Sequence, residues 1–290
     1  MSVRVIAPAS TANLGPAFDS AAAALDLWNE LVVEEAPNGP VVEIEGEGSA
    51  ELPRDESHLA LRAFALFAPV DRHRFSFVNR IPLERGLGSS AAAIALGLLA
   101  GSAVAGQEVS TEELLSLGLT LEEHADNLAA TLFGGVCVVW HSNGHVRAAR
   151  IAADLPLASI LAVPAGRTNT AASRNGLPLT ITHKDAAANA GFAAMLGAAI
   201  ASGDAGLLGD AFHDRLHEQY RIDGTPLLKL LRSNAPDGTV GVTLSGSGPS
   251  VVVWAAQERA ADVATELERS LPPDTRVLPL RVAQEGARLA

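Results

Sequence analysis

The stretch that decides how this chain folds is Gly86-Leu87-Gly88-Ser89-Ser90-Ala91-Ala92. It follows a strand-like segment at 75–81, and it opens an apolar segment that predicts a helix at 89–105. Glycines ahead of a helix let backbone amides approach a ligand closely, and the first helical turn leaves N–H groups unpaired at the positive end of the helix dipole. The stretch therefore predicts a phosphate-binding loop.

This loop differs from the two commonest phosphate loops. A P-loop has a lysine directly after its second glycine, and a Rossmann loop has the pattern G-x-G-x-x-G. Here two serines follow Gly88 instead. A hydroxyl on the first turn of such a helix can reach a Mg²⁺ ion held by nucleotide phosphates. Taken alone, the same residues also fit a serine N-cap with small residues behind it, so the rest of the sequence has to separate the two interpretations.

Composition limits the partners and the compartment. The net charge is −12, which argues against nucleic-acid and anionic-membrane partners because both require clustered basic residues. Lys184 and Lys229 are the only lysines, so an anionic substrate would depend on arginines, backbone amides or a metal ion. The single Cys137 rules out a disulfide framework and fits a reducing cytosol. No secretory pattern is present at the N-terminus, and we expect a cytoplasmic location.

One segment needs to be weighed as a membrane span. Residues 86–106 contain no charged side chain, and this apolar segment is nearly long enough to cross a bilayer. Glycine and serine recur through it, and its hydrophobicity is that of alanine. A buried central helix is the better interpretation.

Alternating and helical apolar patterns divide the chain into strands and helices. Strands are expected at 2–8, 25–35, 41–45, 74–81, 136–141, 145–149, 158–164, 240–244, 250–254 and 276–281. Helices are expected at 57–67, 89–105, 110–131, 186–202, 205–219, 226–233 and 258–270. The order predicts an α+β protein with a boundary after Asp154-Leu155-Pro156, giving one domain at 1–155 and a second at 156–290.

Three further motifs stand apart from the glycine loop. The first is Pro8-Ala9-Ser10-Thr11-Ala12-Asn13-Leu14-Gly15-Pro16-Ala17-Phe18-Asp19, where a strand ends in a turn. The second is Glu122-Glu123-His124-Ala125-Asp126-Asn127, near the end of the helix expected at 110–131. The third is Leu244-Ser245-Gly246-Ser247-Gly248-Pro249-Ser250, between two strands. Singly they fit an Asx-bonded turn, a solvated helix face and a flexible turn, but their joint occurrence indicates a functional site.

Together these motifs resemble the GHMP small-molecule kinases over nearly the whole chain, and most closely the members that act on L-homoserine. The family's glycine-rich motif, P-x-x-x-G-L-G-S-S-A-A, is matched without a gap from Pro82 to Ala92. The family's first motif, P-A-S-x-A-N-L-G-P-G-F-D, is followed except that Ala17 replaces a glycine. In the E-G-H-P-D-N motif, Glu123 replaces the glycine and Ala125 the proline.

The resemblance implies a two-domain α+β kinase that uses ATP and Mg²⁺. Its N-terminal ATP-binding domain would have a left-handed βαβ topology, against the usual right-handed rule, and its C-terminal domain would be a ferredoxin-like sandwich. The adenine would lie between the strands before the glycine loop and the helix after it. Ser90 and Glu122 would hold the Mg²⁺ ion. The implied nucleotide-binding residues are Pro82, Leu83, Glu84, Arg85, Gly86, Leu87, Gly88, Ser89, Ser90, Ala91 and Ala92.

The resemblance also implies the acceptor, L-homoserine, which would become O-phospho-L-homoserine on the way to threonine. A zwitterion needs a carboxylate for its ammonium group, implied here as Asp19 with Asn13, and cations for its carboxylate. The implied substrate residues are Asn13, Asp19, His124, Asn127, Thr170, Arg174, Arg221 and Gly246, of which Thr170, Arg174 and Arg221 hold the carboxylate. The implied catalytic group is Ser90, Glu122, Asp126 and Asn127. Asp126 is the candidate base if one operates, whereas Asn127 faces the hydroxyl and only orients it if none does.

A separate pair of histidines allows a second interpretation. His213 and His217 lie four apart in the helix expected at 205–219, so they share one face. With Asp210 or Glu218 they have the composition of a zinc site. A solvated or carboxylate-paired helix face is the simpler interpretation.

Two other functions share the motifs. One is a kinase of the same family with a mevalonate-pathway or sugar substrate. The other is a nucleotide-binding regulator without turnover, although Ser90, Glu122 and both arginines are intact. In each case we expect a small-molecule partner and no nucleic-acid or membrane partner. The chain is also compatible with a homodimer.

Overall fold

Two β-sheets organise the chain. The computed structural model describes residues 2–36, 39–168 and 170–290, without the side chains at 170–172. In this part, the first sheet consists of β1 (Ser2–Ala12), β2 (Ala21–Glu35), β3 (Val41–Gly46), β4 (His73–Asn79), β5 (Val136–Ser142), β6 (His145–Ala152) and β11 (Arg288–Leu289). The second consists of β7 (Leu157–Val163), β8 (Thr239–Leu244), β9 (Val251–Ala256) and β10 (Arg276–Leu280). The predicted α+β class is confirmed.

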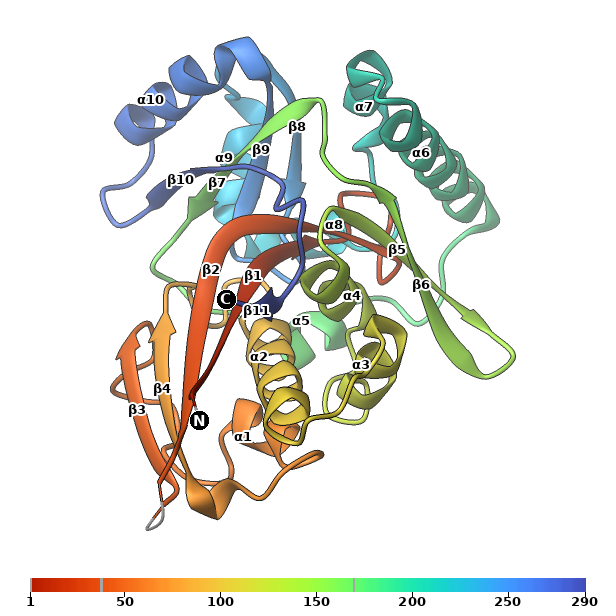
Figure 1. Ribbon diagram of the computed structural model, residues 1–290. Coiled ribbons are helices and arrows are strands. Elements are labelled where there is room, and N and C mark those ends of the chain that lie inside the picture. The colour runs from red at the N-terminus through yellow and green to blue at the C-terminus, as the bar shows by residue number, and fades with distance from the viewer. Residues whose placement is uncertain (1, 37–38, 169) are drawn as a thin grey trace.

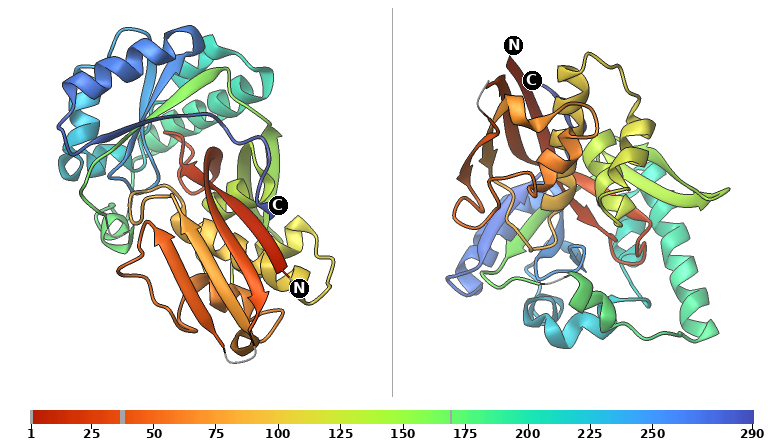
Figure 2. Two further views of the ribbon diagram at one scale, coloured as in Figure 1. Left: turned by 60° about the vertical axis from the view of Figure 1, so that its left-hand side comes forward. Right: turned by 90° about the horizontal axis from the view of Figure 1, so that it is seen from below.

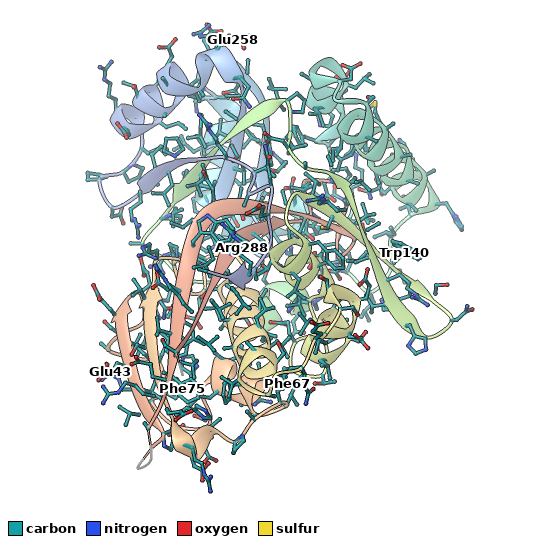
Figure 3. The ribbon with its side chains drawn as sticks, viewed as in Figure 1. Glu43, Phe67, Phe75, Trp140, Glu258 and Arg288 are labelled. Atoms are coloured by element: carbon teal, nitrogen blue, oxygen red, sulfur yellow. The ribbon has the colours of Figure 1, made fainter. Side chains whose placement is uncertain are left out.

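The first sheet has the order β11-β1-β2-β4-β3, with β5 joined to β2 and β6. Only β3 and β4 pair in parallel, around α1 (Leu59–Phe64). The left-handed sense implied for this domain stays a prediction. Buried and half-buried residues alternate along β4, as expected for a strand with one face on the core. Phe75 of β4 packs edge-on against Phe64 of α1, with ring centroids 5.0 Å apart, on the helix side of the sheet (Figure 3).

Helix α2 (Ser89–Val104) is the central helix and contacts β1 and β2 together with α4 (Ala125–Phe133) (Figure 1). It carries no charge and most of its residues are buried, which explains its uniformly apolar sequence. Gly97 allows close packing, because a Cβ there would lie 2.1 Å from the Ala60 carbonyl oxygen of α1. No helix in the described part of the chain is long and apolar enough to cross a membrane. The prediction of a buried central helix is confirmed.

The second sheet has the antiparallel order β10-β7-β9-β8. Helices connect β7 to β8 and β9 to β10, which is the split βαβ order of a ferredoxin-like sandwich and confirms that expectation. Figure 2 (left) shows this sheet above the first, with α10 on its outer side. Its helices are α5 (Thr170–Asn175), α6 (His183–Ser202), α7 (Ala205–Ala211), α8 (Glu218–Arg221), α9 (Pro226–Ser233) and α10 (Ala260–Ser270), with one-turn 3₁₀ segments at Ile222–Gly224 and Gln257–Arg259.

The chain after β10 returns to the first sheet. The Ala283 amide donates to the Ala24 carbonyl at 3.0 Å, and the Ala290 amide donates to the Arg4 carbonyl at 2.9 Å. The side chain of Arg288 lies over the Trp28 ring, 4.9 Å from its centroid (Figure 3). The predicted domain boundary at 155/156 stays a prediction.

Two predicted helices were wrong. The helix expected at 110–131 is divided into α3 (Thr111–Gly118) and α4, so the segment with Glu122 and His124 is a loop. The helix expected at 205–219 ends as α7 at Ala211, and the four-residue α8 follows. His213 and His217 therefore do not share a helix face, which removes the basis of the zinc interpretation.

Candidate active site

A cavity of about 500 Å³ brings the four motifs together. Its lining includes every predicted nucleotide residue from Pro82 to Ala91. It also includes the predicted catalytic and substrate residues Asn13, Asp19, Ser90, Glu122, His124, Asp126, Asn127, Arg174, Arg221 and Gly246. Ala92 is not part of the lining, because its side chain is fully buried in the core. The side chain of Thr170 lies outside the described residues.

The glycine loop ends at the start of α2. Gly88 is the N-cap residue, with φ 68°, and no side chain caps the helix. This corrects the interpretation of a serine N-cap. The first intrahelical bond runs from the Ala92 amide to the Gly88 carbonyl at 2.9 Å, so Ala92 has no amide left for a phosphate. The amides of the preceding turn have no intrahelical acceptor, which is the arrangement that binds anions at helix N-termini.

Both glycines of the loop contact neighbouring backbone or side chains closely. A Cβ on Gly88 would lie 2.0 Å from the Ser10 hydroxyl oxygen, and a Cβ on Gly86 would lie 2.0 Å from the Ser245 carbonyl oxygen. The Ser245 hydroxyl donates to the Gly86 carbonyl at 2.7 Å. The segment 244–250 is therefore packed against the glycine loop, rather than being the isolated flexible turn that it resembled by itself.

Arg85 lines the cavity and supports the loop through its guanidinium. Its guanidinium donates to the carbonyls of Pro164 at 3.0 Å, Leu83 at 2.8 Å and Ala165 at 2.8 Å. These bonds tie the loop to the chain that follows β7. The guanidinium is occupied by backbone acceptors, so the predicted binding of phosphate by this loop would depend on its backbone amides.

Glu122 lies in the loop before α4, beside the start of α2. It accepts hydrogen bonds from the Ser90 hydroxyl at 2.6 Å and from His124, whose Nδ1 is 2.5 Å from its Oε1. Burial raises the pKa of this carboxyl, but the hydrogen bonds from His124 and Ser90 outweigh burial and bring the pKa to about 2. The same contact raises the pKa of His124. Glu122 is therefore an anion at neutral pH, and with Ser90 it presents two oxygen donors of the type that hard cations bind.

Asp126 and Asn127 form the first turn of α4. Burial raises the pKa of Asp126 to about 6, and the nearby charge of Asp19 adds to this effect. The Ser10 hydroxyl donates to Oδ1 of Asn127 at 2.9 Å. This bond fixes the side-chain amide of Asn127 with its oxygen toward Ser10, which leaves the NH₂ group as the end able to meet a substrate.

Three charged side chains lie beyond this turn. Arg174 and Asp19 form a two-pronged ion pair with both N–O distances at 2.8 Å. Arg221 is 8% exposed and donates to the Gly246 carbonyl at 3.3 Å. Its Nε is buried and has no hydrogen-bond partner within the described residues. A buried donor without an acceptor costs free energy, so an anion that accepts from Arg221 would be stabilised on this side of the cavity.

Asn13 shapes the turn that carries Asp19. Its NH₂ group donates to the Gly246 carbonyl at 3.0 Å, and its carbonyl oxygen accepts from the Asp19 amide at 3.0 Å. Both ends of this amide are thus engaged within the protein. The predicted contact of Asn13 with an ammonium group stays a prediction.

An apolar part of the cavity was missed by sequence reasoning. Its residues include Leu52, His58, Phe77 and Leu96. His58 is the N-cap of α1 and accepts from the Ala60 amide at 3.2 Å. Its Nε2 is buried without a partner in the described part of the chain, and its ring packs on Phe77 with centroids 4.6 Å apart. Apolar side chains beside one unpartnered ring nitrogen have the chemistry that a nucleobase site requires, although no local sequence pattern around His58 indicates this.

Comparison with known proteins identifies the class. The family model for the GHMP kinase N-terminal domain matches residues 58–135. A curated protein of Streptomyces coelicolor is 40% identical over 98% of this chain and 93% of its own length. The chain belongs to the GHMP kinase family and is an ATP-dependent kinase with a small-molecule substrate.

The relatives narrow the class further. The Streptomyces coelicolor protein is named homoserine kinase, as is a Moorella thermoacetica protein that is 38% identical over 85% of both chains. The crystal structure of homoserine kinase from Cytophaga hutchinsonii superimposes with a TM-score of 0.89 at 26% identity, covering 100% of this chain and 97% of the other. The recognition of the family from its motifs is confirmed.

Metal-binding side chains form no cluster of their own. Within 2–36, 39–168 and 170–290, no group of three or more His, Cys, Asp or Glu side chains is arranged to hold a metal ion. A cation at Ser90 and Glu122 would therefore take its remaining ligands from phosphate and water, as Mg²⁺ commonly does.

Proposed function

We propose that this protein is a homoserine kinase, which transfers the γ-phosphoryl group of ATP to the hydroxyl of L-homoserine and forms O-phospho-L-homoserine. The observation that carries the proposal is the pairing of opposite charges in one cavity with a phosphate loop. Asp19, Arg174 and Arg221 line the same cavity as Gly86 and Gly88. A zwitterionic alcohol has the charges that this arrangement requires.

The ion pair between Asp19 and Arg174 supports selection of a zwitterion. With no substrate, the two side chains neutralise each other. Homoserine offers Asp19 an ammonium group and the arginines a carboxylate, so one ion pair is exchanged for two. A substrate with one charge breaks the pair and leaves a protein charge unmatched, which costs affinity. The unpartnered Nε of Arg221 gives the carboxylate a second donor.

The nucleotide would bind along the other lining residues. Its phosphates would meet the amides at the start of α2, and its adenine the slot at His58 and Phe77. Mg²⁺ would be held by Ser90 and Glu122, and it would supply charge neutralisation for the phosphates. We expect Ser90→Ala and Glu122→Gln each to lower kcat at least about a hundredfold with the fold retained. Unchanged turnover in both variants would remove them from the metal site.

The acceptor hydroxyl would lie against the NH₂ group of Asn127. Asp126, with a pKa of about 6, is largely ionised at pH 7 and able to take the hydroxyl proton. We therefore expect kcat to rise with pH through about 6 and Asp126→Asn to remove that step. A flat pH profile in both proteins would mean that Asn127 orients the hydroxyl without a base.

The proposal is tested by coupled ADP release at saturating ATP. L-homoserine should be the best acceptor in a panel that includes mevalonate, galactose and 4-hydroxybutyrate. Asp19→Ala should reduce kcat/KM for homoserine far more than for 4-hydroxybutyrate, because only homoserine has the ammonium group. Faster turnover of mevalonate or a sugar would assign another family activity. No turnover of any acceptor with ATP bound would favour the regulator.

The homodimer, the lack of nucleic-acid partners and the cytoplasmic location stay predictions.

A further inference from the structure

His217 is a buried residue that the phosphoryl-transfer scheme leaves unexplained. It is 0% exposed and lies at the start of α8, one turn before Arg221. Its ring stacks on Phe18 of the first motif, with centroids 5.0 Å apart and planes 26° apart. The sequence allowed a zinc site or a solvated or carboxylate-paired helix face. His217 is not solvated, and no metal-type cluster includes it within the described residues, but it does lie beside a carboxylate, with Nε2 3.6 Å from Oδ1 of Asp214.

The two ring nitrogens of His217 have different partners. Nε2 is 2.9 Å from the Gly15 carbonyl oxygen and 3.6 Å from Oδ1 of Asp214. Both neighbours are acceptors, so Nε2 carries the hydrogen. Nδ1 is 3.1 Å from Nη1 of Arg221, which can only donate. His217 is therefore the neutral tautomer with its lone pair on Nδ1, because a second ring proton would point at a cation.

This lone pair is one of two fixed acceptors for the Arg221 guanidinium, the other being the Gly246 carbonyl. The Phe18 ring adds a third contact, since the guanidinium carbon lies 5.5 Å from its centroid. Both fixed acceptors meet the same Nη1, and the buried Nε has no partner within the described residues. Arg221 lines the cavity, so a ligand carboxylate there would meet the guanidinium donors that His217 and Gly246 do not engage.

We propose that His217 is a positioning residue for the substrate carboxylate: its Nδ1 holds Arg221 so that the free donors of the guanidinium face the cavity. The inference rests on the proposed homoserine kinase activity and deepens it. His217 touches neither substrate in this scheme. Its effect passes through Arg221, so it is specific for acceptors that carry a carboxylate.

Two substitutions separate the two hydrogen bonds. His217→Gln places an amide nitrogen near the Nε2 position and keeps the bond to Gly15, but it removes the acceptor for Arg221. His217→Asn places an amide oxygen near the Nδ1 position and keeps that acceptor, but it loses the bond to Gly15. We expect H217Q to raise the KM for homoserine at least about tenfold, with kcat and the KM for ATP within about twofold. H217N should keep the KM for homoserine within about threefold of wild type.

The control for an indirect effect is a double-mutant cycle. In an Arg221→Ala background, H217Q should change the KM for homoserine by less than about twofold, because the acceptor has lost its partner. With 3-aminopropan-1-ol, an acceptor without a carboxylate, H217Q should leave kcat/KM unchanged. Independent effects of the two substitutions, or equal losses with both acceptors, would overturn the inference.

Stability and the parent activity are checked separately. Melting temperatures identify any variant that loses its fold. If H217Q does not fold, H217N still decides, because a KM for homoserine as high as that of Arg221→Ala would overturn the role of the Nδ1 acceptor. Wild type that does not phosphorylate homoserine would refute the proposed function and this inference together. Wild type that does so with independent effects in the cycle would refute this inference alone.

Discussion

Gly88 combines two constraints in one residue. Its φ of 68° is unfavourable for residues with a side chain, and a Cβ would collide with the Ser10 hydroxyl, which in turn bonds Asn127. We expect Gly88→Ala to abolish measurable ATP binding in calorimetry. Gly106, just beyond the end of the same helix, has a φ of 65° with nothing within 4 Å of a Cβ, so Gly106→Ala controls for backbone strain alone. Equal loss of ATP affinity in both variants would show that strain, rather than the Ser10 contact, is responsible.

Burial of the Asp126 carboxylate lowers the stability of the folded protein near neutral pH. Burial raises its pKa to about 6 from an ordinary value of 3.8, so the folded state binds this proton more tightly than the unfolded state. The contribution of Asp126 to the free energy of unfolding is therefore most favourable below about pH 4, and it is lost as the pH rises through about 6. We expect Asp126→Asn to increase the free energy of unfolding by up to about 3 kcal/mol at pH 7.5 and by almost nothing at pH 4. A gain independent of pH in urea titrations would contradict this.

At the scale of elements, the start of α4 departs from the family's proline. Ala125 is the first residue of α4 and follows His124 in an extended conformation, with φ −93° and ψ 91°. Proline suits this position, because the first helical amide has no intrahelical acceptor. We expect Ala125→Pro to stabilise the protein by about 0.4–1 kcal/mol in urea unfolding. Ala129→Pro, inside the same helix, should cost about 3 kcal/mol or more. Destabilisation by both would mean that the Ala125 amide is needed.

Elements with strong local patterns could be predicted from the sequence. The central helix was expected at 89–105 and spans Ser89–Val104, because its apolar run and glycine start are local signals. The two strands of the β5–β6 hairpin were also expected, and Asn143 and Gly144 between them adopt the positive φ that its turn requires. Boundaries set by tertiary contacts could not be predicted. Ala21 to Ala24 join β2 although alanine is a poor strand former, because all four are buried.

The two broken helices have the same physical cause. Glu122 accepts from the amides of Glu123 and His124, and Asp214 accepts from the amides of Leu216, His217 and Glu218. Each carboxylate replaces helical hydrogen bonds with bonds to the following backbone. Sequence periodicity does not register this competition. That the motif residues would gather around one cavity was predictable from the motifs, whereas the contacts of Ser10, His58 and His217 that support this cavity depended on the folded geometry.

At the scale of the whole molecule, the C-terminal segment completes the first sheet. Besides its bonds to Ala24 and Arg4, it accepts the Gly135 amide at the Ala283 carbonyl, 2.7 Å away, and Val282 and Ala283 are buried. We expect a chain ending at Arg281 to lose at least about 2 kcal/mol of unfolding free energy, because several backbone bonds and buried contacts disappear.

The control for this deletion is Leu289→Ser, because Leu289 lies in the same segment but is 56% exposed. Its unfolding free energy should stay within about 0.5 kcal/mol of wild type. Chemical denaturation of both proteins measures the difference. A shortened chain as stable as wild type would show that the first sheet does not need this segment.

Ser10 links the places where the two small molecules are to bind. Its amide donates to the Leu87 carbonyl of the glycine loop at 3.1 Å, and its hydroxyl donates to Asn127. If nucleotide binding shifts the loop, these two bonds would carry the shift through Ser10 to Asn127, the residue proposed to meet the acceptor hydroxyl. We therefore expect the two affinities to be thermodynamically coupled, and the factor by which ATP tightens homoserine binding must equal the factor by which homoserine tightens ATP binding. Ser10→Ala should bring that factor toward one, so that ATP and homoserine bind independently of each other.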